Sequence, residues 1–296
     1  MLGDFAKHKN SKKTMKEKLL FAAAALLLAA CTSVNAPEDV AADVEDVADG
    51  DLVQVRVALS GFDVSVTKAA VSDVCTRLDV WIYESGAEVH AAHQLSTDEG
   101  FGGLDLTLNR TKTYTLYAVA HKGSAAASLA DGIISFPDDK VTHTFYIRRT
   151  FQPTDDMELA LSMVRIVAQL RLETTDAVPA DVTTMRFTLS GVFDRWSVTD
   201  GATHQVDRVV TFDGFSRKQD GTAAFTVYSI VNDEAPIHAL TVEALDEDGN
   251  VVQTKELSVP LLTNRRTTAS GNFFTDAAST LGFSLNTDWG DDQVVD

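Results

Sequence analysis

Two closely spaced histidines are the residues best suited to bind a metal. His90 and His93 read H-A-A-H, and on a helix this spacing would place both rings on one face. A zinc site needs three or four ligands, usually with further Cys or His residues at defined spacings. The chain has no H-E-x-x-H motif and no second Cys/His cluster. The pattern therefore favours a surface loop, and we expect no metal and no cofactor.

Carboxylates and tryptophans are the other groups able to act on or hold a substrate. With 43 acidic residues in the chain, carboxylate pairs like those of glycosidases are uninformative. The sequence has no nucleophile elbow, phosphate loop or dinucleotide fingerprint. Trp196 and Trp289 lie near expected turns and are candidate sugar contacts, whereas Trp81 lies in an expected strand and is assigned to the core. We expect no catalytic residue and no enzymatic activity.

Cys31 follows a short apolar run. The run from Leu19 to Ala30 comes after two lysines and is shorter than the about 20 residues that span a bilayer. Its length and basic flank fit a secretory signal, residues 1–30, with translation starting at Met15 and residues 1–14 as an upstream extension. The stretch LAAC, ending at Cys31, resembles a bacterial lipobox.

The lipobox resemblance implies a lipid anchor. A peptidase would cut between Ala30 and Cys31, the thiol of Cys31 would receive diacylglycerol, and its new amino group a fatty acyl chain such as palmitate. Several acyl chains give stable attachment, so the mature protein would be tethered to a membrane without crossing it. Cys75 would then have no disulfide partner, and the absence of a nearby His favours a buried core thiol.

The charge balance limits the partners. The chain has 25 basic and 43 acidic residues, for a net charge of −18. Residues 1–30 hold six Lys and two acids, which leaves 19 basic and 41 acidic residues, or −22, from Cys31 onward. This charge argues against nucleic acid and anionic lipid as general partners.

The rest of the chain reads as an acidic tether followed by strands. Residues 31–51 are acidic and have no aromatic residue, which is typical of a solvated tether. From Leu52 onward, alternating runs rich in Val, Ile, Thr, Tyr and Phe predict an all-β fold. We expect two tandem β-sandwich domains, residues 52–156 and 157–296, with five or six strands before Pro153. A short helical turn is expected at residues 123–132, and DEDGN at 246–250 predicts a hairpin.

One long amphipathic strand is expected to open the second domain. In LALSMVRIVAQLRLETT, Met163, Arg165 and Val167 would lie on one face. Val164 and Ile166 would lie on the other, because side chains alternate along a strand.

Three segments carry a family resemblance: MVRIVAQLRLE from Met163, VPLLTNRRTTASGNFF from Val259, and FSLNTDWGDD from Phe283. With these, the chain resembles the fimbrillin-like lipoproteins of type V pili, in particular the FimB-like anchor and accessory subunits. The resemblance implies two transthyretin-like sandwich domains and assembly by β-strand addition with a fimbrial subunit. It also implies a place at the fimbrium base, lipid-anchored on the outer membrane and exposed at the cell surface, with a role in cell adhesion.

Basic residues near the start of the folded region bear on the role within that family. The resemblance implies that an Arg-directed protease removes the first strand of polymerising pilins. No Lys or Arg occurs from Cys31 to Val55, and Arg56 lies inside the first expected strand. This favours an uncut, lipidated anchor. A fimbrial tip or shaft subunit and a surface glycan-binding lipoprotein remain as alternatives, and any small-molecule ligand is unknown.

Overall fold

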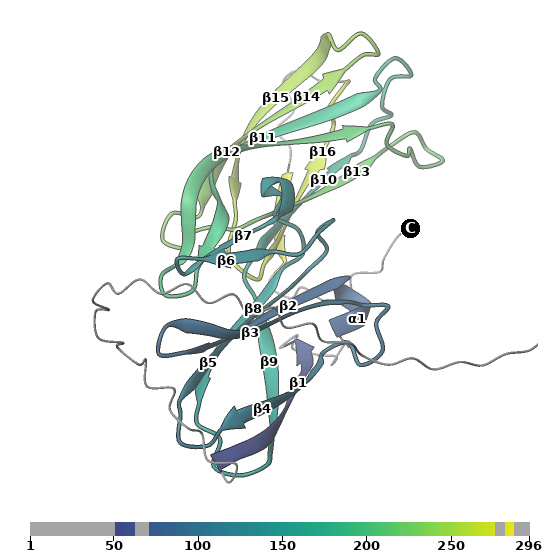
Figure 1. Cartoon of the computed structure of the whole chain (residues 1–296). Helices are drawn as coiled ribbons and strands as arrows, with labels where there is room; N and C mark the ends of the chain where they lie inside the picture. The colour runs from purple at the N-terminus through teal and green to yellow at the C-terminus, as the bar shows by residue number, and fades with distance from the viewer. Residues whose placement is uncertain (1–50, 63–70, 276–281, 287–296) are drawn as a thin grey trace, which may run out of the picture. The chain divides into compact units, whose positions relative to one another are not determined.

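The computed structural model describes residues 51–62, 71–275 and 282–286. These residues lie within one compact unit, Val47–Asp296, and a second unit, Met1–Asp46, lies outside the described part. The expected signal, the Ala30–Cys31 cleavage and lipidation site, and all but the last residue of the tether therefore fall outside the described residues. Within them nearly all regular secondary structure is strand, as Figure 1 shows, and the all-β prediction is confirmed.

The first sheet has seven strands, and its ends are the strands β3 and β4. In order across the sheet they are β3 (Ala87–Leu95), β2 (Arg77–Glu84), β5 (Tyr114–His121), β8 (Phe145–Phe151), β9 (Met157–Arg165), β1 (Leu52–Phe62) and β4 (Gly103–Asn109). β8 and β9 share only two register pairs, Phe145↔Arg165 and Tyr146↔Val164, so the sheet divides there into two halves. A short helix, α1 (Val71–Val74), precedes β2.

A hydrophobic core lies between these two halves. Alternate residues of β1, such as Val55 and Val57, and of β2, such as Val80 and Ile82, contribute to one cluster of buried side chains. Leu106 of β4 belongs to the same cluster. Alternation of apolar residues along each strand therefore builds a two-layered sandwich around this core.

Two further sheets enclose a second core. One is β13 (Ala224–Ser229), β10 (Ala168–Thr174), β16 (Arg266–Gly271) and β17 (Gly282–Asn286). The other is β15 (Val251–Pro260), β14 (Ile237–Leu245), β11 (Thr184–Ser197), β7 (Ile133–Ser135) and β6 (Ser128–Ala130), with β12 (Gly201–Asp213) also paired to β11. Phe187, Leu170 and Phe273 are among the buried members of this second core.

Several strands were not predicted. Eight strands precede Pro153 in the described chain, against five or six expected. Residues 123–132 do not form a helical turn, because Asp131 and Gly132, both with positive φ, make a tight turn between β6 and β7. An Asp-Gly pair is a hairpin signal, and it overrides the helix-favouring alanines before it.

The expected long strand is two strands in different sheets. β9 ends at Arg165 and β10 begins at Ala168, with Ile166 and Val167 buried between them. Met163 and Arg165 are buried and Val164 is 52% exposed, so the burial phase shifts where the chain changes sheets. The chain thus passes from one sheet to the next after Arg165. The division into domains between residues 156 and 157 stays a prediction.

Three local predictions are confirmed. DEDGN joins β14 to β15 as a hairpin, and Gly249 has a φ of 81°. Cys75 and Trp81 are buried, with exposed fractions of 1% and 3%.

Among the described helices, none has the length and apolar character needed to cross a membrane.

Candidate binding site

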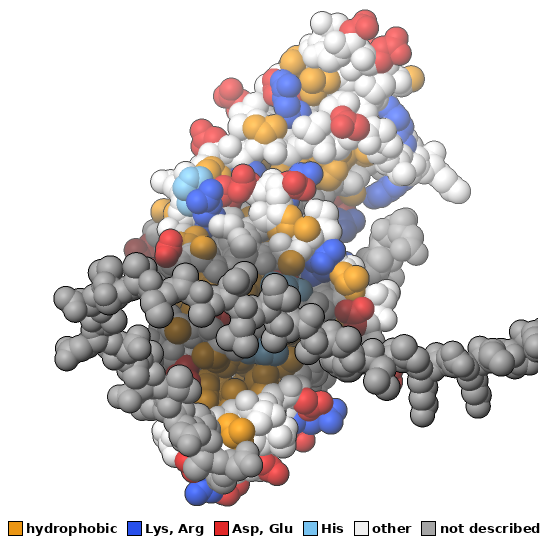
Figure 2. Space-filling model, viewed as in Figure 1, with side chains coloured by type: hydrophobic (Ala, Val, Ile, Leu, Met, Phe, Trp, Pro, Cys, Tyr) orange, Lys and Arg blue, Asp and Glu red, His pale blue; other side chains and the backbone are white. Residues whose placement is uncertain are grey.

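The two end strands of the first sheet face each other across an open side of the sandwich. β3 and β4 follow one another in the chain, and a side-chain amide on β3, Gln94, contacts the start of β4 at Gly102 and Gly103. A pocket of about 380 Å³ lies between the two strands. Figure 2 shows hydrophobic side chains open to view in this part of the molecule. We call this opening the β3–β4 gap.

The backbone edges that border the β3–β4 gap are unpaired. Gly102 and Arg110, at the two ends of β4, bond to Leu59 and Asp51 on the β1 side. Because antiparallel residues alternate between bonding inward and outward, Asp105 and Thr107 turn their N–H and C=O groups away from β1. No other strand of the described chain pairs with β4 there.

The same alternation applies to β3. Ser96 donates its N–H to Thr76, which continues the β2–β3 pairing past the strand end. Ala91 and His93 therefore turn their backbone groups away from β2 and toward the gap. Along the strands that the structure describes, this edge also has no partner.

The pocket in the gap has a mixed lining of apolar and polar side chains. Val89 of β3 and Leu106 and Leu108 of β4 supply apolar lining, and Leu52 is 43% exposed beside them. His90 also lines the pocket, and its Nε2 atom is buried with no hydrogen-bond partner among the described residues.

The gap is closed at both ends. At one end Gln94 bridges to β4, and Leu95 exchanges hydrogen bonds with Asp98 (2.7 and 2.9 Å). At the other end the backbone N–H of Asn109 donates to the Tyr114 hydroxyl (3.0 Å), and Lys112 pairs with Glu84 (3.4 Å). Its open part therefore corresponds to about five residues of β4, or roughly 17 Å of strand.

His90 and His93 lie in a strand and not in the expected loop. Residues three apart in a strand point to opposite faces, so His90 faces the gap and His93 faces the other side. The strand escaped prediction because β3 lies at the sheet edge and its side chains are mostly exposed or half-buried. It therefore lacks the alternating hydrophobicity of a core strand.

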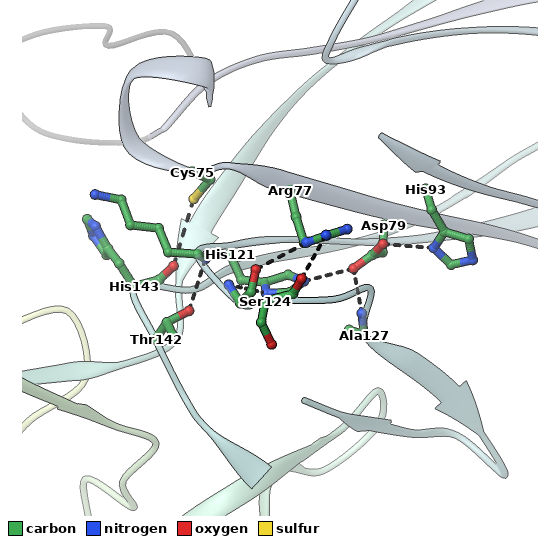
Figure 3. A network of polar contacts seen from close by, with 11 residues as sticks. Cys75, Arg77, Asp79, His93, His121, Ser124, Ala127, Thr142 and His143 are labelled. Atoms are coloured by element: carbon green, nitrogen blue, oxygen red, sulfur yellow. Dashed lines mark hydrogen bonds and ion pairs between the residues drawn. The ribbon is translucent and has the colours of Figure 1, made fainter. Parts of the chain in front are cut away.

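Asp79 gathers a buried polar network beneath His93 (Figure 3). Its carboxylate is 1% exposed and contacts His93 Nδ1 at 2.7 Å, His121 Nε2 at 2.8 Å and the N–H of Ala127 at 2.8 Å. The N–H of Gly123 donates to His121 Nδ1 (2.9 Å), so the ring proton of His121 lies on Nε2 and is donated to Asp79.

This network fastens the segment after β5 to the sheet. Arg77 donates to the carbonyls of Gly123 (3.1 Å) and Ser124 (2.8 Å), next to the groups that Asp79 holds. Among the described contacts, no hydroxyl or thiol bonds to the second ring nitrogen of His93. The network reads as structural.

Cys75 is also unsuited to nucleophilic chemistry. Burial raises the pKa of its thiol well above the usual value, although the charges of Lys122 and Arg165 act in the opposite direction. Its Sγ lies 3.8 Å from the carbonyl oxygen of His143. A buried thiol that stays protonated is an inert core residue.

A second buried carboxylate lies on β11. Asp194 is 6% exposed, and its Oδ1 lies 2.7 Å from Nδ1 of His204 and 3.9 Å from Nε of Arg195. Burial lowers the pKa of nearby Arg208 to about 10, against the attraction of Asp194. Arg208 donates to the carbonyls of Tyr228 and Val141, both at 2.7 Å, so this cluster also joins backbone segments.

Trp196 is half-buried and does not project into solvent as a flat platform. Its ring lies 5.6 Å from that of Tyr146, at an interplanar angle of 58°, and contacts a hydrophobic cluster that includes Ile134. Its Nε1 atom is buried without a hydrogen-bond partner in the described part of the chain. Trp289 lies outside the described residues, so its role as a sugar contact stays a prediction.

Metal ligands do not gather anywhere in the described chain. No group of three or more His, Cys, Asp or Glu side chains there is placed to hold an ion. The β3–β4 gap, which the sequence did not reveal, places a pocket between two strand edges that are unpaired within the described residues. A weak signal was present in AEVHAAHQL and GLDLTLN, two short runs on either side of a glycine-rich turn.

Comparison with solved structures identifies the fold. A Bacteroides thetaiotaomicron protein provisionally described as polysaccharide-binding aligns with a TM-score of 0.51 and 12% identity, covering 80% of this chain and 96% of that one. The fimbrial anchor protein Mfa2 from Porphyromonas gingivalis aligns at 0.48 and 10%, covering 80% and 98%. A Bacteroides ovatus protein provisionally described as an adhesin aligns at 0.49 and 12%, covering 79% and 95%. At this identity the first likeness shows a shared fold.

Comparison of the sequence identifies the family. No curated protein matches the chain in sequence. The sequence profile of a family of unknown function, DUF6562, matches residues 136–295, which is more than half of the 296 residues. The chain therefore belongs to the DUF6562 family.

Proposed function

We propose that this protein is the membrane-tethered anchor or accessory subunit of a surface fimbria and binds its partner subunit by β-strand addition. The observation that carries the proposal is the β3–β4 gap. Its two unpaired backbone edges offer hydrogen bonds to an extended segment, and the pocket between them accepts alternate side chains. Such edges are normally protected in a protein that works alone, because they invite pairing with other chains.

The sequence supplies the tether in this proposal. The lipobox places the lipid on Cys31, and the acidic residues 31–51 connect it to the first strand. The lack of any Lys or Arg from Cys31 to Val55 supports a first strand that stays in place. β1 is paired on both sides, with β4 and β9, so its removal would separate β4 from the rest of the first sheet. The role is structural, and we propose no catalytic activity.

To test the proposal, the full-length protein is purified from membranes of cells that make fimbriae, and the proteins bound to it are identified. We expect mass spectrometry to find a fimbrial subunit enriched with the protein, whose own amino terminus is Cys31. If no fimbrial subunit is enriched over a Cys31→Ser control, the proposal is overturned. An amino terminus at Ala69 or Leu78 in assembled fimbriae would instead make the protein a shaft or tip subunit.

Glycan binding is the second candidate, and the polar groups of the pocket favour it. The volume of about 380 Å³ fits a small ligand, and Glu84, Asp105 and Tyr114 line the same pocket as His90. A structural neighbour is also provisionally described as polysaccharide-binding. A glycan array with the Cys31→Ser protein tests this. Binding that Asp105→Ala abolishes would favour glycans, and no binding across glycan classes would remove this candidate.

A further inference from the structure

A cluster of charged and aromatic side chains lies where the chain passes from the first sheet to the sheets of the second core. Arg165, the last residue of β9, donates from Nε to Nε2 of His143 (2.8 Å) and from Nη1 to Oδ1 of Asn264 (2.9 Å). His143 stacks on Tyr228 of β13, with ring centroids 5.2 Å apart and an interplanar angle of 13°. We call these four residues, together with Arg266 of β16, the junction cluster.

One row of side chains connects the junction cluster to the end strand of its sheet. Gln169 of β10 stands opposite Tyr228 on one side and Arg266 on the other. Its amide donates to the Tyr228 hydroxyl (3.0 Å) and accepts a hydrogen bond from Nε of Arg266. β17 is the next strand, and its last residue, Asn286, pairs in register with Arg266. The chain therefore leaves the sheet beside Arg266, at the end where the junction cluster lies.

The junction cluster is a region of positive charge in an acidic protein. Arg165 is only 7% exposed, and Arg265 and Arg266 are half-buried. Burial, and then the positive charges of this region, lower the pKa of His143 to about 2, so its ring stays neutral. A carboxylate is the group that such a region attracts, and the attraction is stronger where water is partly excluded.

The sequence that follows β17 carries complementary groups. It reads TDWGDD from Thr287 to Asp292, and these residues lie outside the described ranges. An extended chain advances about 3.3 Å per residue, so Trp289 is within about 10 Å of Asn286 along the chain. Tyr228 stands three strands from β17, or about 14 Å. Three residues and two aromatic side chains are enough to cover that distance.

We infer that residues 287–292 cross this face of the sheet and cover the junction cluster, with the Asp288 carboxylate on Arg266 and the Trp289 indole on the ring of Tyr228. We call this contact the clasp. Tyr228 and Arg266 are half-buried, so both offer surface to the segment. The occupant is this chain's own segment, because it starts beside the cluster, carries the opposite charge and includes an indole. The inference is independent of the proposed function, since every part of it belongs to one chain.

The clasp fastens the end strand of the sheet. Among the described strands β17 pairs only with β16, so the clasp adds a second attachment at the carboxyl end of β17. It also bridges two sheets, because Arg165 comes from the first sheet while Tyr228 and Arg266 come from another. Trp289 then has a partner within the molecule and is not a sugar contact.

Hydrogen exchange of the full chain, followed at the amides of β17, tests the clasp. The exchange rate of a strand follows the fraction of time for which it is open. Trp289→Ala should raise exchange in β17 roughly tenfold, and Asp288→Asn roughly fivefold, the usual contributions of an aromatic pair and of a partly buried ion pair. Trp289→Phe should raise it less than Trp289→Ala does. The amides of β10 are the internal reference, and their exchange should stay unchanged.

A double-variant cycle identifies the partner of Asp288. If Asp288 pairs with Arg266, then Asp288→Asn should have no further effect on β17 exchange in the Arg266→Gln background. Arg171→Gln is the matched control, because Arg171 lies on β10 and pairs with Glu173 (2.7 Å). In that background Asp288→Asn should keep its roughly fivefold effect. Thermal unfolding of each variant checks that it folds.

Photo-crosslinking gives a second measurement, with benzoylphenylalanine in place of Trp289. We expect the crosslink within the chain to fall on the peptide that contains Tyr228. Crosslinks to other peptides only, or an equal effect of Asp288→Asn in the Arg266→Gln and Arg171→Gln backgrounds, would overturn the clasp. Unchanged β17 exchange in Trp289→Ala would overturn it as well, and loss of glycan binding in that variant would then make Trp289 a ligand contact.

Discussion

At the scale of single residues, the buried carboxylate of Asp79 organises the network of hydrogen bonds around it. It is almost completely buried and receives three hydrogen bonds, two of them from histidine rings. A buried charge is tolerated only when such donors replace its water. The network therefore depends on the charge of Asp79 and on the tautomer of His121.

Asp79→Asn should destabilise the fold strongly. The amide oxygen could still accept from His121 and Ala127, but these two bonds and the contact with His93 would no longer be strengthened by the charge of a carboxylate. We expect the free energy of unfolding to fall by about 3 kcal/mol, the usual cost of breaking one partner of a buried charged pair. Urea denaturation measures this, with the exposed Asp105→Asn as control. A loss of less than about 1 kcal/mol would show that the carboxylate is not essential.

Gly123 contributes to the same network by leaving space for the ring of His121. A Cβ at this position would lie 2.6 Å from Nδ1 and 2.7 Å from Cε1 of His121. Gly123→Ala should therefore push the ring away from Asp79 and cost about 2 kcal/mol of unfolding free energy. Gly86→Ala is the matched control, since its Cβ meets nothing within 4 Å and only its positive φ of 85° is strained. Equal losses in the two variants would contradict a steric role.

At the scale of elements, Asp176 fixes the chain that follows β16. Its carboxylate accepts the N–H groups of Phe273, Phe274 and Thr275 at 2.6 to 2.8 Å, and the Thr275 hydroxyl at 3.0 Å. Burial opposes ionisation of Asp176, but these four donors outweigh it and lower the pKa of the carboxyl. A side chain between β10 and β11 thus holds a segment almost a hundred residues later in the chain.

Acid should release this segment. Because the folded pKa of Asp176 is below the unfolded value near 3.8, its stabilisation is present above that value and is lost as the pH falls through the folded pKa. We expect the urea midpoint to fall more between pH 6 and pH 3 in the wild type than in Asp176→Asn. Asp181→Asn, an exposed carboxylate in the same loop, should keep the wild-type slope. An identical slope in Asp176→Asn would contradict this role.

Strand patterns predicted the paired centre of the fold better than its edges. Runs such as those around Val55 and Val80 alternate clearly because one face of each strand packs on a core. β3 and β6 were missed because a strand at an edge has little to bury, so its sequence is not forced to alternate.

The site was missed for a related reason. The β3–β4 gap arises where two edges meet across a curved sheet, and no local pattern records that meeting. Gln94 is an ordinary polar residue in the sequence, and only the structure shows that it bridges β3 to Gly102 and Gly103. The change of sheet at Ile166 and Val167 was hidden likewise, because a continuous apolar run serves both strands.

At the scale of the whole molecule, the net charge bears on the proposed lipid attachment. The sequence from Cys31 onward carries a net charge of −22. Anionic phospholipid repels such a protein, so the folded part contributes no attraction of its own to a membrane surface. Under the proposed function, attachment would depend on acyl chains at Cys31, because buried hydrocarbon is insensitive to salt.

Cys31→Ser should therefore abolish membrane attachment completely, and at every ionic strength. In flotation of cell membranes, we expect the wild type to float with lipid both at about 0.1 M and at about 1 M salt, since the Debye length differs threefold between them and hydrophobic anchoring does not respond to it. The Cys31→Ser protein should remain at the bottom in both. Cys75→Ser, which changes the buried cysteine, should float like the wild type. If Cys31→Ser protein still floats, another segment attaches the chain, and the division between a lipid tether and a repelled body is wrong.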